Sequence, residues 1–187
     1  MKKITCIVGR ARKNGSCAYL TDKFIKGAQG NAEVKRYFAS ELKINYCLGC
    51  KSCYVDGECV QSDGVKNIIS DVLSSDYVVI VAPSYRADVP AQLKTLFDRT
   101  TPYGDTNPNR KYVAEKQIKG IAIAVRAGKT QAENELILNS IQHYFGHLGI
   151  ETVKRISICE TNTLDDLIKK HQKELEDIER LGKTVTA

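Results

Sequence analysis

No long apolar run occurs in this 187-residue sequence. A membrane-spanning helix needs about 20 consecutive apolar residues, and no stretch approaches that length. The apolar run after Lys2 and Lys3 ends at Arg10 after about six residues, which is shorter than the core of a secretory signal. We therefore expect a cytoplasmic protein without a membrane partner.

Signatures of nucleic-acid binding are also missing. The sequence has neither the aromatic motif of RNA-recognition domains nor the Cys/His spacing of zinc fingers. Its net charge of +6 is a modest basic excess, and an excess of this size does not by itself indicate nucleic acid. We expect no nucleic-acid partner.

Histidine is scarce, with three residues in the chain. His143 and His147 are four residues apart on a predicted helix, a spacing that could suit a metal ion, but the H-E-x-x-H motif is absent. No Ser-His-Asp arrangement can be argued either. We assign both histidines surface or capping roles and name no catalytic residue.

Apolar segments alternate with helical patterns along the chain, as in proteins built from β-α-β units. The predicted strands span residues 3–8, 33–38, 77–82, 119–125 and 152–158, and the predicted helices span 16–28, 64–74, 91–99, 132–148 and 163–181. Neither an internal repeat nor a linker interrupts this series. The best fit is a single α/β domain over residues 1–187, a flavodoxin-like three-layer sandwich around a five-stranded parallel sheet in the order 2-1-3-4-5.

The strand order predicts where a ligand binds. In such sheets the site lies beyond the carboxyl ends of the strands, where the first and third strands diverge in their connections. The loops at 9–17 and 83–90 are therefore the predicted site. A long polar stretch, 100–117, is a candidate subunit interface, because loops of this length are often functional.

The loop at 9–17 joins the first strand to the first helix and reads Gly-Arg-Ala-Arg-Lys-Asn-Gly-Ser-Cys. Backbone amides at a helix N-terminus bind anions, and the helix dipole adds to this. The loop is neither a Walker loop nor G-x-G-x-x-G, which argues against ATP or a dinucleotide here. A single terminal phosphate, as on FMN, fits better, and the alternative is a solvated basic turn. The candidate phosphate-binding residues are Arg12, Lys13, Asn14, Gly15 and Ser16.

Four of the seven cysteines, Cys47, Cys50, Cys53 and Cys59, fall within thirteen residues with the spacing C-x2-C-x2-C-x5-C. They lie in a segment, 44–62, inserted after the second strand. Ferredoxin-type runs share the first spacings, although no proline follows the last cysteine. Three interpretations stay open: a [4Fe-4S] cluster, a zinc site that three closely spaced cysteines would crowd, and unligated thiols.

The other three cysteines carry no expected chemistry. Cys6 and Cys159 are predicted to be buried small residues on strands. Cys17 is predicted to be helical and non-catalytic.

Two segments resemble the NAD(P)H-dependent FMN reductase family. Residues 4–17 resemble its first strand and phosphate loop, whose usual form is G-S-P-R-K-N-G-N-T, and residues 76–99 resemble its third strand and following helix. The cysteine run resembles the iron-sulfur flavoprotein branch, which carries C-x2-C-x2-C-x4–7-C. The resemblance covers residues 1–100 well and the remainder mainly by architecture. It departs from the pattern at Arg10 for Ser, Ala11 for Pro and Cys17 for Thr.

The resemblance implies a set of flavin contacts. Tyr85 would form an aromatic wall beside the flavin ring, or else be an ordinary tyrosine at a strand end. Arg86 would meet a pyrimidine carbonyl of FMN or a phosphate of the nicotinamide cofactor, or else face solvent or another subunit. The full set of implied FMN-binding residues is Arg10, Arg12, Asn14, Gly15, Ser16, Cys17, Pro83, Ser84, Tyr85, Arg86, Arg126 and Gly128.

The function implied by the resemblance is an FMN-dependent oxidoreductase that accepts hydride from NAD(P)H. Electrons would pass to an unidentified acceptor, through a [4Fe-4S] cluster if one is present, in a homodimer or homotetramer. One alternative is a non-enzymatic electron-transfer protein with flavin and cluster. The net charge of +6 favours the enzyme, because flavodoxin-type carriers are acidic. Another alternative is a zinc- or thiol-based sensor without flavin.

Overall fold

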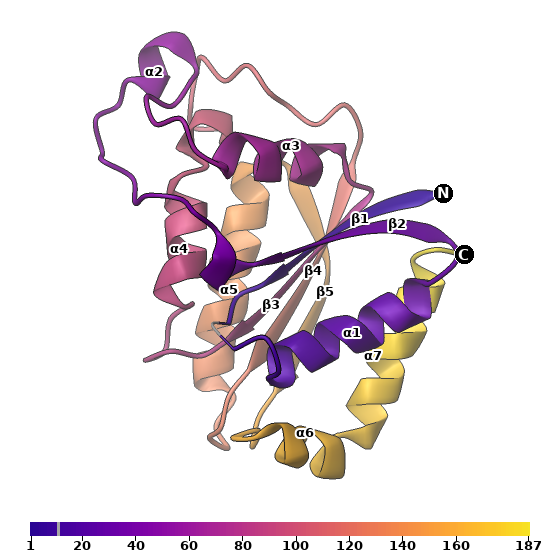
Figure 1. Ribbon diagram of the computed structural model, residues 1–187. Helices are drawn as coiled ribbons and strands as arrows, with labels where there is room; N and C mark the ends of the chain where they lie inside the picture. The colour runs from indigo at the N-terminus through magenta and orange to yellow at the C-terminus, as the bar shows by residue number, and fades with distance from the viewer. Residues whose placement is uncertain (11) are drawn as a thin grey trace.

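The computed structural model describes residues 1–10 and 12–187, so Ala11 of the predicted phosphate loop lies outside the described residues. Five parallel strands form one sheet in the order β2-β1-β3-β4-β5 (Figure 1). This confirms the predicted flavodoxin-like order. The strands are β1 (Lys2–Val8), β2 (Ala32–Phe38), β3 (Tyr77–Pro83), β4 (Ile118–Val125) and β5 (Ile150–Ile158).

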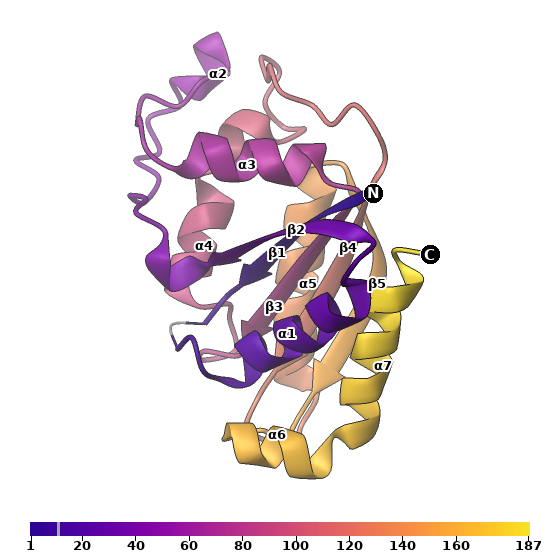
Figure 2. The same cartoon turned by 45° about the vertical axis from the view of Figure 1, so that its right-hand side comes forward.

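Helices cover both faces of the sheet (Figure 2). One face carries α1 (Ser16–Ala28), α6 (Leu164–Lys170) and α7 (Gln172–Thr184), and the other carries α3 (Val65–Ser74), α4 (Ala91–Asp98) and α5 (Ala132–His147). Three short helices lie in the connections: η1 (Ala39–Glu41), α2 (Cys53–Asp56) and η2 (Thr101–Tyr103). The three layers predicted from the sequence are present.

The central strand β3 is buried on both faces because it runs between two helical layers. Val79 and Val81 point into the core beneath α1 and α7, whereas Val78 and Ile80 point into the core beneath α3, α4 and α5. A continuous apolar run is what such a strand requires. The apolar run in the sequence therefore matches the burial of β3 on both faces.

The predicted last helix, 163–181, is two helices in the structure. The chain breaks at His171, whose φ of −125° and ψ of 37° lie outside the helical region. The first piece, α6, starts with a capping box in which Thr163 and Asp166 bond each other's backbone amides. The apolar spacing continues across the break, so periodicity alone could not reveal it.

Two glycines allow α1 and α7 to pack with their backbones in contact. A Cβ atom at Gly27 would lie 1.8 Å from the carbonyl oxygen of Glu179, and one at Gly182 would lie 2.1 Å from that of Phe24. The sequence pattern predicts a helix that ends at 181 with Gly182 as its stop, yet Gly182 lies inside α7. Close packing is the reason that this position holds glycine.

No helix among the described residues has both the length and the apolarity that crossing a bilayer would demand.

Candidate functional site

The loops that follow β1, β3, β4 and β5 meet at one end of the sheet, which we call the carboxyl edge (Figure 1). Backbone hydrogen bonds continue from the strands into these loops. The Gly9 amide donates to the Val81 carbonyl at 2.8 Å, and the Ser84 amide donates to the Val125 carbonyl at 2.9 Å. A Cβ atom on Gly9 would lie 2.8 Å from Leu93, so the loop after β1 leaves the sheet in close contact with α4.

Arg10 folds into the loop before α1. Its exposed fraction is 8%, and its guanidinium packs over Gly15, the N-cap residue of α1, with the closest atoms 3.4 Å from where a Cβ would stand. The Nε atom is buried and has no hydrogen-bond partner in the described part of the chain. The structure thus places an arginine charge inside the predicted phosphate loop, at the positive end of a helix dipole.

Arg10 differs from the other enclosed arginines in its surroundings. Arg99 faces Asp63 and Arg126 faces Glu133, each within ion-pair distance. Among the described residues, no carboxylate lies within that distance of Arg10. A buried cation without a counter-ion is unfavourable, so this loop is suited to receive an anion.

The remaining residues of the phosphate loop divide into buried and exposed groups. Ser16 is buried, and its hydroxyl donates to the Thr163 carbonyl at 3.4 Å. Burial raises the pKa of the Cys17 thiol to about 12, although Arg10 acts in the opposite direction. Cys17 therefore stays protonated. It lies in α1, in agreement with its predicted helical position. The exposed side chains are Arg12, Lys13, which pairs with Glu41, and Asn14.

A tight turn follows β3. Tyr85 and Asp88 exchange backbone hydrogen bonds of 2.9 and 3.2 Å. The two residues between them, Arg86 and Ala87, have φ angles of 56° and 62°. Left-handed backbone is unfavourable for residues with a side chain, and such strain gathers at functional sites. The turn holds the half-exposed ring of Tyr85 and the exposed side chain of Arg86 at the carboxyl edge, beside Pro83.

Glu133, near the start of α5, is a residue of the candidate site that the sequence did not reveal. Its two carboxylate oxygens bind different loops: one accepts from the Ser84 hydroxyl at 3.0 Å, and the other pairs with Arg126 at 3.0 Å. Arg126 also donates to the Thr130 carbonyl. Glu133 therefore links the two loops expected to flank the flavin. Its signal was weak, because an acidic residue in the first turn of a helix is common.

Gly128 lies close to a side chain of its own loop. A Cβ atom there would be 2.5 Å from Nη2 of Arg126. The family resemblance implies that Gly128 lets a flavin approach the backbone closely. The structure gives a nearer cause, since the guanidinium of Arg126 fills that space.

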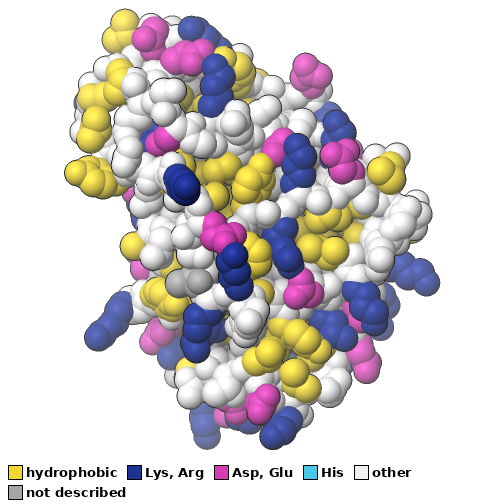
Figure 3. All heavy atoms as spheres, in the orientation of Figure 1, with side chains coloured by type: hydrophobic (Ala, Val, Ile, Leu, Met, Phe, Trp, Pro, Cys, Tyr) yellow, Lys and Arg dark blue, Asp and Glu magenta, His cyan; other side chains and the backbone are white. Residues whose placement is uncertain are grey.

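The four clustered cysteines line one cavity of about 230 Å³, the cysteine cavity. Its wall also includes Leu48, Val60, Arg99 and Pro102. Figure 3 shows hydrophobic side chains, a class that includes Cys, gathered over the cysteine segment 44–62 and α2. All seven cysteines are free. Within the described residues, no three potential ligand side chains converge on one metal-ion position.

The thiols of this cavity differ in environment. Cys47 and Cys50 are exposed, whereas Cys53 and Cys59 are partly buried. Burial raises the pKa of Cys53, and the neighbouring thiols Cys59, Cys47 and Cys50 add to this through charge repulsion. The hydrogen bond from Ser52 lowers the pKa of Cys50. Four sulfur donors around a cavity fit a bound multi-iron group better than one zinc ion, which needs all four at about 2.3 Å from a single point.

The stretch 100–117 supports the cysteine segment from outside. The Asn107 side chain donates to the Cys53 carbonyl at 3.0 Å, and the Asn109 side chain donates to the Tyr54 carbonyl at 2.6 Å. Asn107 is 2% exposed. Part of this polar stretch thus has a structural role within the chain that the sequence did not indicate.

The helix α4 separates the cysteine cavity from the carboxyl edge. The cavity is built on residues 98–102, at the C-terminal end of α4, whereas the Tyr85–Asp88 turn precedes its N-terminal end. Eight residues of α-helix span about 12 Å. Within one chain, the two candidate sites are therefore separated by about the length of this helix.

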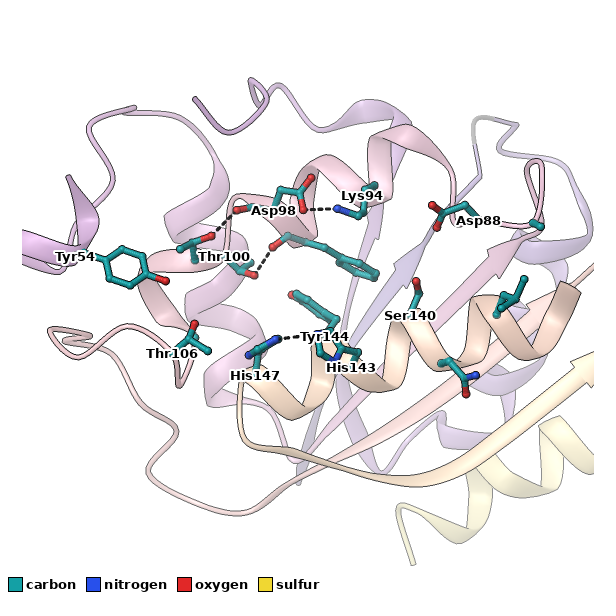
Figure 4. Close-up of a pocket in the computed structure, with 16 residues that line it drawn as sticks. Tyr54, Asp88, Lys94, Asp98, Thr100, Thr106, Ser140, His143, Tyr144 and His147 are labelled. Carbon is teal, nitrogen blue, oxygen red and sulfur yellow. Dashed lines mark hydrogen bonds and ion pairs between the residues drawn. The ribbon is translucent and has the colours of Figure 1, made fainter. Parts of the chain in front are cut away.

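A larger pocket of about 830 Å³ lies between α4 and α5 (Figure 4). It reaches the carboxyl edge only through Ala87 and Asp88. His147, on its far side, bonds Asp105 at 2.7 Å and His143 at 3.0 Å. By volume alone this pocket would be the candidate functional site, but the buried Arg10 and the converging loops favour the carboxyl edge.

The remaining two cysteines give one confirmed and one wrong prediction. Cys6 is fully buried on β1, as predicted. Cys159 follows β5 and is partly exposed. It lies 3.7 Å from the side-chain nitrogen of Asn134, at the end of the strand where the chain leaves the core.

Comparison with protein families identifies a family for this chain. A family model described as NADPH-dependent FMN reductase matches residues 2–158. An iron-sulfur flavoprotein of Archaeoglobus fulgidus is 40% identical over 103 residues, which cover 54% of this chain and 47% of that protein. An iron-sulfur flavoprotein of Methanosarcina thermophila is 30% identical over 152 residues, which cover 81% and 76%. The chain thus spans about half of the first relative and three quarters of the second.

Solved structures share the fold at low sequence identity. An azoreductase from Bacillus anthracis has a TM-score of 0.74 at 16% identity, covering 98% of this chain and 100% of that one. An NAD(P)H:quinone oxidoreductase from Methanothermobacter marburgensis has a TM-score of 0.73 at 14% identity, covering 98% and 96%. At these identities the likeness shows the fold alone.

Proposed function

Because the chain belongs to the NADPH-dependent FMN reductase family, we propose that it is an FMN-dependent oxidoreductase that accepts hydride from NAD(P)H. Arg10 is the observation that carries this proposal. Its buried guanidinium lacks a carboxylate partner among the described residues and lies at the start of α1. The single phosphate of FMN supplies the missing charge.

The family pattern has hydroxyl side chains where this chain has Arg10 and Cys17. The thiol of Cys17 is a weak donor, so the loop loses two hydroxyl contacts to a phosphate. A charge-assisted hydrogen bond from arginine is stronger than a neutral one. Arg10 therefore compensates for both, while the amides around Gly15 and Ser16 complete the phosphate site.

When bound, FMN supplies the hydride and single-electron chemistry. The residues of the carboxyl edge bind and orient it: Pro83, Ser84 and Tyr85 form one wall, and the loop of Arg126 and Gly128 forms the other. Glu133 keeps the two walls at a fixed separation through its two hydrogen-bonded partners. No side-chain acid or base is required, and no catalytic residue is assigned.

Arg86 projects beyond this wall into solvent from a strained turn. In this position it meets a phosphate of the incoming nicotinamide nucleotide or a carbonyl of the flavin pyrimidine. Exposed Arg12 and Asn14 add donors at the phosphate end. The nearby Lys13 is paired with Glu41.

The four cysteines would hold a [4Fe-4S] cluster in the cysteine cavity. Their shared cavity, their free thiols and the buried arginine beside them support this. The names of the Archaeoglobus and Methanosarcina relatives support it as well. The cluster would accept electrons singly and pass them to an acceptor outside the protein.

We further infer a homodimer or homotetramer. The open pocket between α4 and α5, lined by polar and apolar side chains and with Leu136 52% exposed at its rim, offers a surface for a second copy. Light scattering after size exclusion tests this directly, and a monomer at all concentrations would contradict it.

Steady-state oxidation of NADH and NADPH separates the enzyme from the electron carrier. Protein loaded with FMN is expected to turn over with at least one nucleotide and a quinone, azo or flavin acceptor, above the rate of the same free FMN. If protein that holds FMN oxidises neither nucleotide, the non-enzymatic electron carrier becomes the supported function. If the protein binds no FMN, the thiol-based sensor without flavin becomes the supported function.

A further inference from the structure

Arg99, at the C-terminal end of α4, is among the most enclosed charged residues of the chain. Its side chain is 1% exposed. Its Nη1 atom donates to Asp63 Oδ2 at 2.6 Å and to the Asn45 carbonyl at 2.7 Å, and its Nη2 atom donates to Asp63 Oδ1 at 3.1 Å. Asn45 lies at the start of the cysteine segment and Asp63 directly follows its end, so one guanidinium ties both ends to α4.

The same guanidinium also reaches a thiol. Nη2 of Arg99 lies 3.6 Å from Sγ of Cys59, within hydrogen-bonding range for sulfur. Arg99 forms part of the wall of the cysteine cavity, together with all four cysteines. Burial favours protonation of Asp63, but Arg99 and two backbone amides outweigh it and lower the pKa of this carboxyl group. Arg99 therefore places a positive charge on the cavity wall, and Asp63 is its directly bonded negative partner.

We propose that Arg99 is a positioning residue that raises the reduction potential of the cluster held by Cys47, Cys50, Cys53 and Cys59. It does so by donating to the Cys59 sulfur and placing a positive charge at the cavity wall, while Asp63 acts in the opposite direction. This inference rests on the cluster assigned in the proposed function. It concerns the gain of one electron by the cluster, with no bond formed or broken.

The direction follows from charge. Reduction adds one negative charge to a group already surrounded by thiolates, and hydrogen bonds to sulfur and nearby charge set its potential. A positive neighbour stabilises the reduced form, and a negative neighbour destabilises it. Because the pair is buried, water screens these effects less than at the surface.

A purely structural role for Arg99 predicts something different. Loosening either end of the cysteine segment would lower cluster content, whichever partner of the ion pair is changed. The electrostatic role instead predicts shifts of opposite sign for the two partners. Opposite shifts are therefore the readout that separates the roles.

The experiment uses the full chain reconstituted anaerobically with iron and sulfide, and follows the cluster by electron paramagnetic resonance during a redox titration. Arg99→Gln is expected to shift the oxidised-to-reduced equilibrium at least tenfold toward the oxidised form, about 59 mV for one electron. Asp63→Asn is expected to shift it toward the reduced form. Lys66→Gln is the matched control, since it removes one positive charge from an exposed position beside the segment, and a shift under threefold is expected.

If Arg99→Gln alone holds no cluster, the double variant Arg99→Gln/Asp63→Asn removes both charges and leaves no buried carboxylate unpaired. Its equilibrium is expected to lie at least tenfold on the oxidised side of Asp63→Asn. If cluster-loaded variants have the same reduction potential as the wild type, or if both single variants shift it in the same direction, this inference is wrong and the proposed function is unaffected. A wild-type chain that takes up no iron or sulfide would remove the cluster from the proposed function, and this inference with it.

Discussion

Replacing Arg10 by Met tests the phosphate site most sharply. Arg10 is 8% exposed and its Nε atom is unpaired within the described chain. A hydrogen bond to a charged group contributes about 1.5–3 kcal/mol. Loss of the guanidinium should therefore raise the Kd of FMN by about 10- to 150-fold.

Riboflavin, which lacks the phosphate, separates this effect from general damage. Its Kd should be nearly the same for the wild type and Arg10→Met, because the flavin ring contacts other loops. Arg12→Gln is the control at an exposed position of the same loop, and it should weaken FMN binding by less than Arg10→Met does. Quenching of flavin fluorescence on binding measures all of these constants.

Although Arg10→Met should weaken FMN binding, it should not destabilise the flavin-free protein. Without an anion, the buried charge of Arg10 has no carboxylate partner among the described residues, and replacement of such a charge by an apolar side chain is often neutral or stabilising. The free energy of unfolding of Arg10→Met without flavin should not fall below the wild-type value. Equal losses of FMN and riboflavin binding, together with lower stability, would refute the reasoning.

Other predictions concern the helices around the site. Gly182→Ala sets a methyl group 2.1 Å from the Phe24 carbonyl oxygen and should lower the free energy of unfolding by about 1–3 kcal/mol. Gly146→Ala is the control, since a Cβ atom there has no neighbour within 4 Å, and it should raise the free energy of unfolding by up to about 1 kcal/mol. Urea titrations measure both values, and equal effects of the two substitutions would contradict the packing argument. Lys170, with the Thr163 cap, lowers the pKa of Asp166 from 3.8 to about 2, so this stabilisation is complete above pH 3.8 and is lost as the pH falls toward 2. Asp166→Asn should flatten the dependence of Tm on pH in that window, and an unchanged slope would argue against the capping box.

The strand order could be predicted because its signals are local. The apolar run at 77–82 and the alternation of strands and helices depend on neighbouring residues, so the five parallel strands emerged with errors of one or two residues at their ends. The break at His171 could not be found in this way. The apolar positions keep their helical spacing across it, and neither proline nor glycine marks it.

The candidate site also combines features that local sequence reveals with features that depend on distant residues. The phosphate loop and the cysteine run were visible as motifs, but whether Arg10 faces solvent or the loop interior depends on packing over Gly15. Arg99 was missed because an arginine that ends a helix commonly faces solvent. Its partner Asp63 is 36 residues away in sequence, and no local pattern connects the two. Glu133 was missed because an acidic residue in the first turn of a helix is common, and its partner Ser84 is 49 residues away in sequence.

Anaerobic titration of the FMN-loaded chain with NADPH, and separately with NADH, tests the central claim most directly. The account predicts one FMN per chain and loss of the oxidised-flavin absorbance in proportion to the nucleotide added, with at least one of the two. A chain that stays colourless after incubation with FMN would contradict the account. So would bound FMN that dithionite reduces but neither nucleotide does.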